Sequence, residues 1–343
     1  MMKQIYDYTT TETLEKEMDR LFDPYYHFGA HICELAAVDS FVVIDIYKRS
    51  IVLWNDNGEY RAFENSYPHR GCRIIDKDEG CHKLVCPYHK WHFKNGTTIP
   101  SQKEFSQYSQ KELSLHYYDV QICGDFIFFS PKPKMPLKDQ LGNFWEDVFE
   151  ISKSINARVD KNCQFFECNW KIAIENALET YHVPFIHKET LGKLNLQSFL
   201  VEKTKENDIM IAEIGNHKLE KKLKLLKDFF SPKYVKDAYF SMFLYPFSMI
   251  SSTYGYSYAI QNFFPKLETK TKFISKVYSI IEKQNDFYQE VSAVNRQVFE
   301  EDAEICRLAQ LGLENKFNEN SFFYAQNENR IVEFHDHYGS SIL

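Results

Sequence analysis

A pair of histidines, His182 and His187, limits the folds open to this chain. They lie in the segment 169–191, which reads NWKIAIENALETYHVPFIHKETL. Imidazole nitrogen is the commonest protein ligand for a transition metal, and two imidazoles with one carboxylate leave coordination positions open, as in non-haem iron sites. Nearby histidines also occur as ordinary hydrogen-bonded helix residues. If this pair binds a metal, a third ligand such as a carboxylate is needed, and Glu175 and Glu179 lie just upstream.

The composition fits a large folded protein and argues against several classes. The chain has 343 residues, 44% hydrophobic and 16% aromatic, enough for two domains. Its net charge of −7 argues against nucleic acid or an anionic membrane as a partner. No apolar run is long enough to span a membrane, and the first residues are too polar for a signal peptide. The eight scattered cysteines indicate reduced thiols or metal ligands, and so a cytoplasmic protein.

Residues 40–131 predict a small β domain. Two parts rich in β-branched and aromatic residues, with an Asn57-Gly58 turn, flank a loop segment at residues 65–93. Apolar periodicity predicts helices over residues 11–22, 217–230 and 285–310, and alternation predicts strands over residues 241–265.

The loop segment carries a second group of potential metal ligands. It reads NSYPHRGCRIIDKDEGCHKLVCPYHKWHF, and sixteen residues separate His69 from Cys86, with His89 close behind. Thiolate and imidazole together are ligands of zinc and of iron–sulfur sites. We expect His82 and His92 to be exposed loop residues.

These segments resemble the large (alpha) subunits of Rieske non-haem iron oxygenases. In the first segment the matching residues are Asn169, Trp170, Lys171, Glu175, Asn176, Glu179, His182 and His187. In the second they are His69, Arg70, Gly71, Cys86, Pro87, Tyr88, His89, Trp91 and Phe93. The resemblance extends from about Tyr25 to His337.

The resemblance implies an α+β fold. A Rieske-like [2Fe–2S] domain, residues 40–131, is expected to be inserted in a catalytic domain whose antiparallel sheet is flanked by helices. Residues 1–39 would be the N-terminal helical part of the catalytic domain, and residues 132–343 its main part with the mononuclear iron.

The resemblance also implies the ligands of a mononuclear Fe(II). These are His182, His187 and Asp302, which fits the family's Glu-Asp pattern ahead of a glutamine and Gly-Leu. Neighbouring glutamates were the other candidates for the carboxylate: Glu300, Glu301 and Glu304.

Three further residues are expected to lie around the mononuclear iron and act with its ligands. Glu179 corresponds to the family's acidic residue that links the iron to the iron–sulfur cluster of a neighbouring subunit. Asn176 and Tyr181 are expected to support the ligands from behind.

The iron–sulfur motif departs from the family pattern at one position. A Rieske centre needs two cysteines on one iron and two histidines on the other, supplied as C-x-H and C-x-x-H. His69, Cys86 and His89 fill three positions, but Tyr67 stands at the first. Phenolate is a hard donor, unlike thiolate.

Three outcomes stay open for this loop. The [2Fe–2S] cluster is lost and the loop is kept for its fold. Alternatively, Cys72 or Cys81 replaces the missing thiol. In the third outcome, His69, Cys86 and His89 together bind a single metal such as zinc. The sequence favours the first, a protein without a normal Rieske spectrum.

The function implied is an iron-dependent oxygenase that hydroxylates or oxidatively demethylates a small organic substrate with O2. Pocket shape decides between these reactions and dihydroxylation. A reductase or ferredoxin is expected to supply electrons to a homotrimer, or to a hetero-oligomer with a related subunit. A chain without a cluster would instead be a partner subunit, or bind metal without turnover. Candidate pocket residues are Phe243, Tyr245, Phe247, Met249, Tyr254, Tyr256 and Tyr258.

Overall fold

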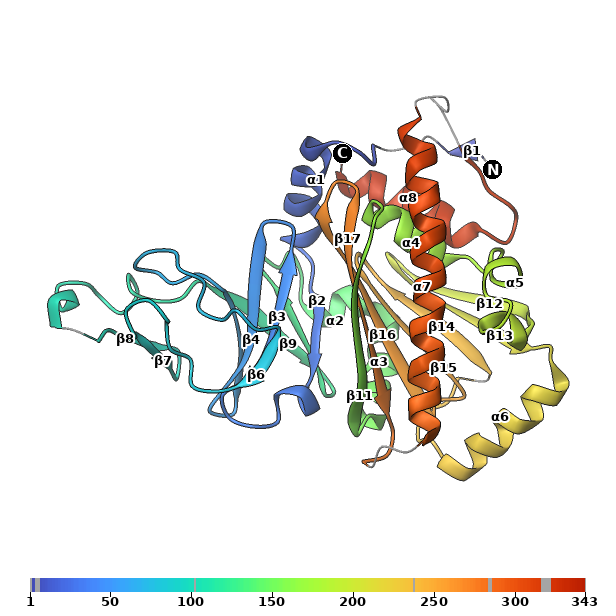
Figure 1. Ribbon diagram of the computed structural model, residues 1–343, viewed down its shortest axis with the longest axis horizontal. Coiled ribbons are helices and arrows are strands. Elements are labelled where there is room, and N and C mark those ends of the chain that lie inside the picture. The colour runs from blue at the N-terminus through green and yellow to red at the C-terminus, as the bar shows by residue number, and fades with distance from the viewer. Residues whose placement is uncertain are drawn as a thin grey trace. The chain divides into compact units, whose positions relative to one another are not determined.

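The chain forms two units, one of them inserted into the other (Figure 1). The computed structural model describes residues 2–3, 7–101, 103–236, 238–282, 286–315 and 322–342. The catalytic unit comprises Met1–Leu21 and Leu141–Leu343, and the inserted unit comprises Phe22–Gln140. Both contain antiparallel sheets, and helices accompany the sheet of the catalytic unit, so the predicted α+β class is confirmed. None of the helices in the described ranges is long and apolar enough to cross a membrane.

The inserted unit is built on a seven-stranded antiparallel sheet in the order β2-β10-β9-β5-β4-β3-β6. The Asn57-Gly58 turn joins β4 to β5, and both residues have positive φ, as a tight hairpin requires. The strands are β2 (His27–His31), β3 (Ser40–Ile46), β4 (Arg49–Asp56), β5 (Glu59–Glu64), β6 (Glu79–Cys81), β9 (Tyr117–Cys123) and β10 (Phe126–Ser130). A separate ribbon pairs β7 (His92–Lys94) with β8 (Thr97–Ile99).

The inserted unit extends beyond the predicted range of residues 40–131. It begins at Phe22, because β2 pairs with β10. It ends at Gln140, whose side chain accepts a hydrogen bond from Tyr26 N at 2.7 Å and donates one to Tyr26 O at 2.9 Å. This double contact holds the two ends of the unit together.

The catalytic unit contains a second seven-stranded antiparallel sheet, in the order β11-β17-β16-β15-β14-β13-β12. Its strands are β11 (Ala157–Phe166), β12 (Leu196–Thr204), β13 (Asn207–Ile214), β14 (Tyr239–Leu244), β15 (Ser248–Thr253), β16 (Ser257–Leu267) and β17 (Lys270–Ser279). A short pair joins β1 (Met2–Lys3) to β18 (Phe322–Phe323).

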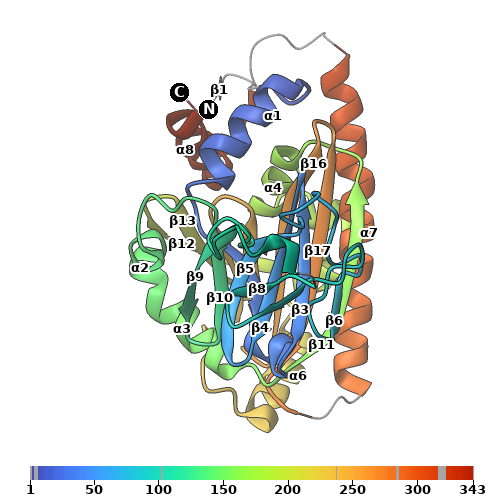
Figure 2. The same ribbon diagram turned by 90° about the vertical axis from the view of Figure 1, so that its left-hand side faces the viewer.

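The longest of the described helices is α7 (Asp286–Glu314), which belongs to the catalytic unit and runs alongside β11 (Figure 2). The others are α1 (Thr11–Glu17), α2 (Leu137–Leu141), α3 (Trp145–Ser154), α4 (Trp170–Leu178), α5 (Val183–Ile186), α6 (His217–Phe230) and α8 (Asn329–Ile342). The predicted helix at residues 217–230 coincides with α6. Residue 285, the predicted start of the long helix, lies outside the described residues.

The Asn-Trp-Lys motif anchors the start of α4. Asn169 caps the helix, its side-chain oxygen accepting from Lys171 N at 2.9 Å. Trp170 Nε1 donates to Glu17 Oε2 at 2.8 Å, and Lys171 Nζ pairs with the same carboxylate. All four side chains are buried. The motif therefore has a structural role: it fixes the helix that carries Asn176.

Candidate metal centre and active site

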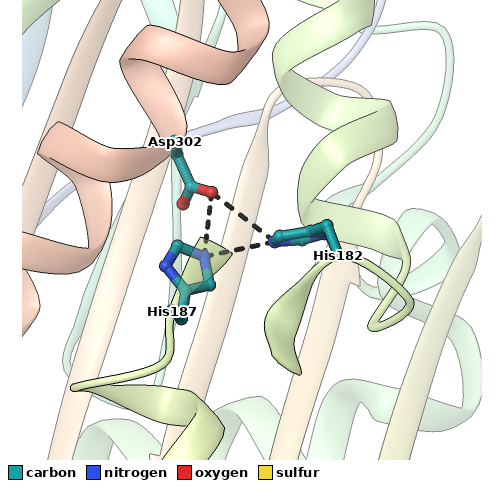
Figure 3. A group of neighbouring side chains, drawn as sticks. All are labelled: His182, His187 and Asp302. Atoms are coloured by element: carbon teal, nitrogen blue, oxygen red, sulfur yellow. Dashed lines mark hydrogen bonds and ion pairs between the residues drawn. The ribbon is translucent and has the colours of Figure 1, made fainter. Parts of the chain in front are cut away.

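Three side chains from distant parts of the chain converge on one point: His182, His187 and Asp302 (Figure 3). The histidines flank α5, and Asp302 lies near the middle of α7. His187 Nε2 lies 3.2 Å from His182 Nε2 and 3.0 Å from Asp302 Oδ1, and the third side of the triangle is 3.6 Å. Two ligands at about 2.1 Å from a metal and at a right angle to each other are about 3 Å apart. The three atoms therefore fit one face of an octahedral site, and the donor set suits Fe(II).

A carboxylate stands behind each histidine of this triad. Glu179 contacts Nδ1 of His182 and also accepts a hydrogen bond from the His182 backbone N at 3.1 Å. Glu301 Oε2 lies 2.7 Å from Nδ1 of His187. Such outer contacts fix the ring orientation and make the facing nitrogen a better ligand. Both Nε2 atoms are thus available at the common point.

Asn176 supports the third side chain. Its Nδ2 donates to Asp302 Oδ1, the oxygen that faces the histidines, at 2.8 Å. Tyr181, the other predicted support, is largely exposed, and it contacts the site only through its backbone N, which donates to Glu179.

The site attracts positive charge. Burial opposes protonation of His187, but hydrogen bonds and charge from Asp302 and Glu301 raise the pKa of this histidine above its usual value. The same field would favour a bound cation.

The loop after α5 requires a glycine where it passes His187. Gly192 N donates to His187 O at 2.8 Å, and a Cβ on Gly192 would lie only 2.7 Å from that oxygen. A side chain at this position would displace the turn that holds His187.

A cavity of about 500 Å³ opens beside the three side chains. Of the predicted pocket residues, Met249 and Tyr256 line it, whereas the other five are buried elsewhere in the core. Tyr239 and Phe263 also line it and were missed. The signal for Tyr239 is strand alternation, since Tyr239 and Ser241 of β14 share one face, as Met249, Ser251 and Thr253 of β15 do, and all five line the cavity.

The two ligand loops of the inserted unit are matching six-residue turns. In the first, Tyr67 N donates to Cys72 O at 2.8 Å and Gly71 N donates to Tyr67 O at 2.7 Å. The second, from Cys86 to Trp91, repeats both hydrogen bonds, and its fifth residue has positive φ, as Gly71 does. Tyr67 therefore occupies the position that corresponds to Cys86.

The predicted imidazoles of these loops lie together. The rings of His69 and His89 have centroids 4.9 Å apart. His89 Nδ1 is buried and has no hydrogen-bond partner, which is rare for a buried polar atom that binds no ligand. His69 Nδ1 lies 3.3 Å from Tyr67 Oη.

The thiols near these loops divide into two kinds. Cys72 is partly buried and packs against the core cluster that contains the buried Cys86, and its Sγ donates to Arg73 O at 3.4 Å; desolvation and the neighbouring Cys86 raise the pKa of Cys72. Cys81 is exposed on β6, and its Sγ donates to Val38 O. The donors present thus fit a Rieske centre in type and number, with one thiol outside the family register.

Family models identify the chain. The model of the ring hydroxylating alpha subunit (catalytic domain) matches residues 150–342, and that of the Rieske [2Fe-2S] domain matches residues 28–109. The first match covers more than half of the chain. This chain belongs to the ring-hydroxylating alpha-subunit family. The resemblance inferred from the sequence motifs is confirmed.

Several known proteins are similar to this chain. The glycine betaine monooxygenase oxygenase subunit of Pseudomonas aeruginosa is 31% identical to this alpha subunit over 192 residues, which are 54% of this chain and 45% of that protein. The chloroplastic choline monooxygenase of Beta vulgaris is 24% identical over 341 residues, 96% of this chain and 74% of that enzyme. The chain thus spans about half the length of the first relative.

Two solved structures have the same fold. The quaternary ammonium Rieske monooxygenase CntA in complex with L-carnitine matches 98% of this chain and 93% of its own, with a TM-score of 0.82 and 19% identity. Naphthalene 1,2-dioxygenase from Rhodococcus matches 99% of this chain and 94% of its own, with a TM-score of 0.77 and 18% identity.

Proposed function

We propose that this alpha subunit is an O2-dependent oxygenase whose ferrous iron is held by His182, His187 and Asp302. The observation that carries the proposal is the triangle of ligand atoms, with sides of 3.0, 3.2 and 3.6 Å, at the wall of a cavity. An iron held by two imidazoles and one carboxylate supplies O2 activation and keeps positions open for it.

The chain's own residues prepare the site for this reaction. Glu179 and Glu301 hold the two imidazoles with Nε2 toward the common point. The Asn176 amide restricts rotation of the Asp302 carboxylate by donating to Oδ1. The cavity walls then orient a substrate beside the three ligand atoms and exclude bulk water.

The charge of the cavity lining indicates the class of substrate. Among the described lining residues there is no Lys or Arg, whereas three carboxylates are present: Glu179, Glu290 and Asp302. A substrate carboxylate would lose its hydration here without gaining a cationic partner. We therefore propose a neutral or cationic organic substrate, for which the aromatic lining, including Tyr239 and Tyr256, offers apolar and cation–π contacts.

This class separates the substrates named for the similar proteins. Choline is a cation without a carboxylate, and naphthalene is neutral. Glycine betaine and L-carnitine each carry a carboxylate. The first two types fit the proposed class, and the last two do not.

The test uses the intact chain loaded anaerobically with Fe(II). Hydrogen peroxide supplies oxygen and electrons together, so it bypasses electron delivery. We expect hydroxylated or demethylated product from neutral or cationic compounds, detected by mass spectrometry, and none from their carboxylate analogues. Product from carboxylates alone would contradict the substrate class. Full iron occupancy without any product, but with turnover on mixing with a related alpha subunit, would support the partner-subunit alternative.

Electron delivery is the second part of the proposal. A reductase or ferredoxin would provide electrons through an oligomer of this chain, with Glu179 as the link to the iron ligand His182. Glu179→Gln should retain iron and peroxide-driven turnover but slow reductase-driven turnover. Loss of iron in this variant even at saturating Fe(II) would instead make Glu179 a metal ligand.

A further inference from the structure

We propose that Cys72 supplies the second thiolate of a [2Fe–2S] cluster in the inserted unit, in place of the cysteine that Tyr67 replaces. This assignment goes beyond the mononuclear iron site and does not depend on it. The Rieske domain match at residues 28–109 implies a cluster with two thiolates on one iron and two imidazoles on the other.

The donors in the loops are already sorted into these two pairs. His69 and His89 form one pair, with ring centroids 4.9 Å apart. Cys72 and Cys86 form the other, since Cys72 packs against the core cluster that contains the buried Cys86. The orphaned, buried Nδ1 of His89 is the kind of atom that a metal satisfies.

The first turn explains how a thiol from residue 72 reaches a position meant for residue 67. Tyr67 N donates to Cys72 O, so the two residues face each other across the closed turn. Gly71, with φ of 66°, reverses the chain just before Cys72. A side chain at residue 72 therefore starts beside the family's ligand position, from the opposite arm of the turn.

Tyr67 is a packing residue rather than a ligand. Its ring is buried and meets Trp91 edge-on, with centroids 5.0 Å apart. The hydroxyl reaches Nδ1 of His69, at 3.3 Å, so cluster binding needs only this weak contact to open.

Cys81 is the matched control. Cys81 is exposed and lies in a strand outside the two turns, whereas Cys72 is half-buried and closes the first turn. The two cysteines lie nine positions apart in the same segment, so a change of Cys to Ser at each tests position alone.

The experiment measures acid-labile sulfide and the visible and electron paramagnetic resonance spectra of anaerobically purified or reconstituted full-length protein. These readouts do not require turnover. We expect about two sulfides per chain in the wild type and in Cys81→Ser, and a loss of nearly all sulfide in Cys72→Ser. Tyr67→Phe should retain the cluster.

A rescue variant separates a ligand from a folding residue. Tyr67→Cys combined with Cys72→Ser returns the thiol to the family position and should restore the sulfide and the spectrum. Retention of the cluster in Cys72→Ser alone would overturn the proposal. So would a wild type that holds zinc without sulfide, that holds no metal in these loops, or whose Cys72 and Cys86 form a disulfide instead of assembling a cluster on reconstitution.

Discussion

The two candidate metal sites of this chain differ in how their ligands are held. His182, His187 and Asp302 match the family positions and are braced from behind by other side chains. In the inserted unit, Tyr67 stands at a ligand position, and a thiol lies across the turn from it. Two of these supporting contacts, from Glu301 and from Asn176, join residues more than a hundred positions apart. In a short closed turn two positions face each other. A cysteine at either position can therefore supply the thiolate, and the set of two thiolates and two imidazoles is kept.

Removing a ligand from the braced site should have the largest effect. Asp302→Ala leaves two imidazoles, which hold a labile metal weakly, so bound Fe(II) should fall by about one per chain. Acid-labile sulfide in the same samples should not change. Glu304→Ala is the control, because Glu304 is exposed and bonds to Arg307. Parallel loss of sulfide and iron in Asp302→Ala would show that the two sites depend on each other.

The helix that carries Asn176 is anchored by the buried pair of Lys171 and Glu17. Lys171→Met leaves the Glu17 carboxylate buried without its cation, which should lower the free energy of unfolding by about 3–5 kcal/mol. Denaturant unfolding followed by fluorescence measures this. Adding Glu17→Gln should recover part of the loss, because no unpaired charge then remains. Equal stability of Lys171→Met and the wild type would refute the role of this pair in anchoring α4.

A buried acid near the iron site gives the same unit a pH dependence. Burial raises the pKa of Glu175 from 4.5 to about 7, despite a hydrogen bond from Tyr8 Oη. The folded state therefore binds more protons than the unfolded state between these values, and stability falls as pH rises through them.

The variant Glu175→Gln removes this titration. Its stability relative to the wild type should increase between pH 4.5 and pH 7 by up to about 3 kcal/mol, since one pKa unit is about 1.4 kcal/mol. Denaturant midpoints measured at several pH values provide the test. A constant difference between variant and wild type would contradict the raised pKa.

The smallest expected effect concerns a residue behind a ligand. Glu301→Gln keeps the shape but removes the charge that faces His187 Nδ1, and should weaken Fe(II) affinity by about 10–100-fold. Chelator competition measures this change. Glu300→Gln, on the exposed face of α7, should leave the affinity unaltered. An affinity loss as large as that of Asp302→Ala would make Glu301 a direct ligand.

Local patterns in the sequence predict most of the elements, because periodicity reports which face of a helix or strand is buried. The segment 217–230 is an example, since its apolar spacing coincides with α6. The limits of the inserted unit were not predicted because they depend on contacts between residues far apart in the sequence. Strand β2 pairs with β10, and the Gln140 side chain bonds to the Tyr26 backbone. No local pattern contains those contacts.

For the candidate site, too, the sequence predicts some residues and misses others. Motifs select His182, His187 and Asp302, and the structure brings their ligand atoms together. The contact of Glu301 with His187 Nδ1 was missed, because it depends on the rotation of α7 about its axis. Likewise, aromatic content suggested Phe243 as a pocket residue, but its ring packs against Tyr245 and Phe334 in the core, and the cavity is lined by Tyr239 and Ser241 instead.

The double contact between Gln140 and Tyr26 has a consequence for biosynthesis. Glu17 is made early, but its partner Lys171 follows 154 residues later. The inserted unit, Phe22–Gln140, is complete once Gln140 leaves the ribosome, and its ends can then be joined locally. Domains generally fold as units in the order in which they are made. We therefore expect the inserted unit to fold before the Glu17–Lys171 contact of the catalytic unit can form.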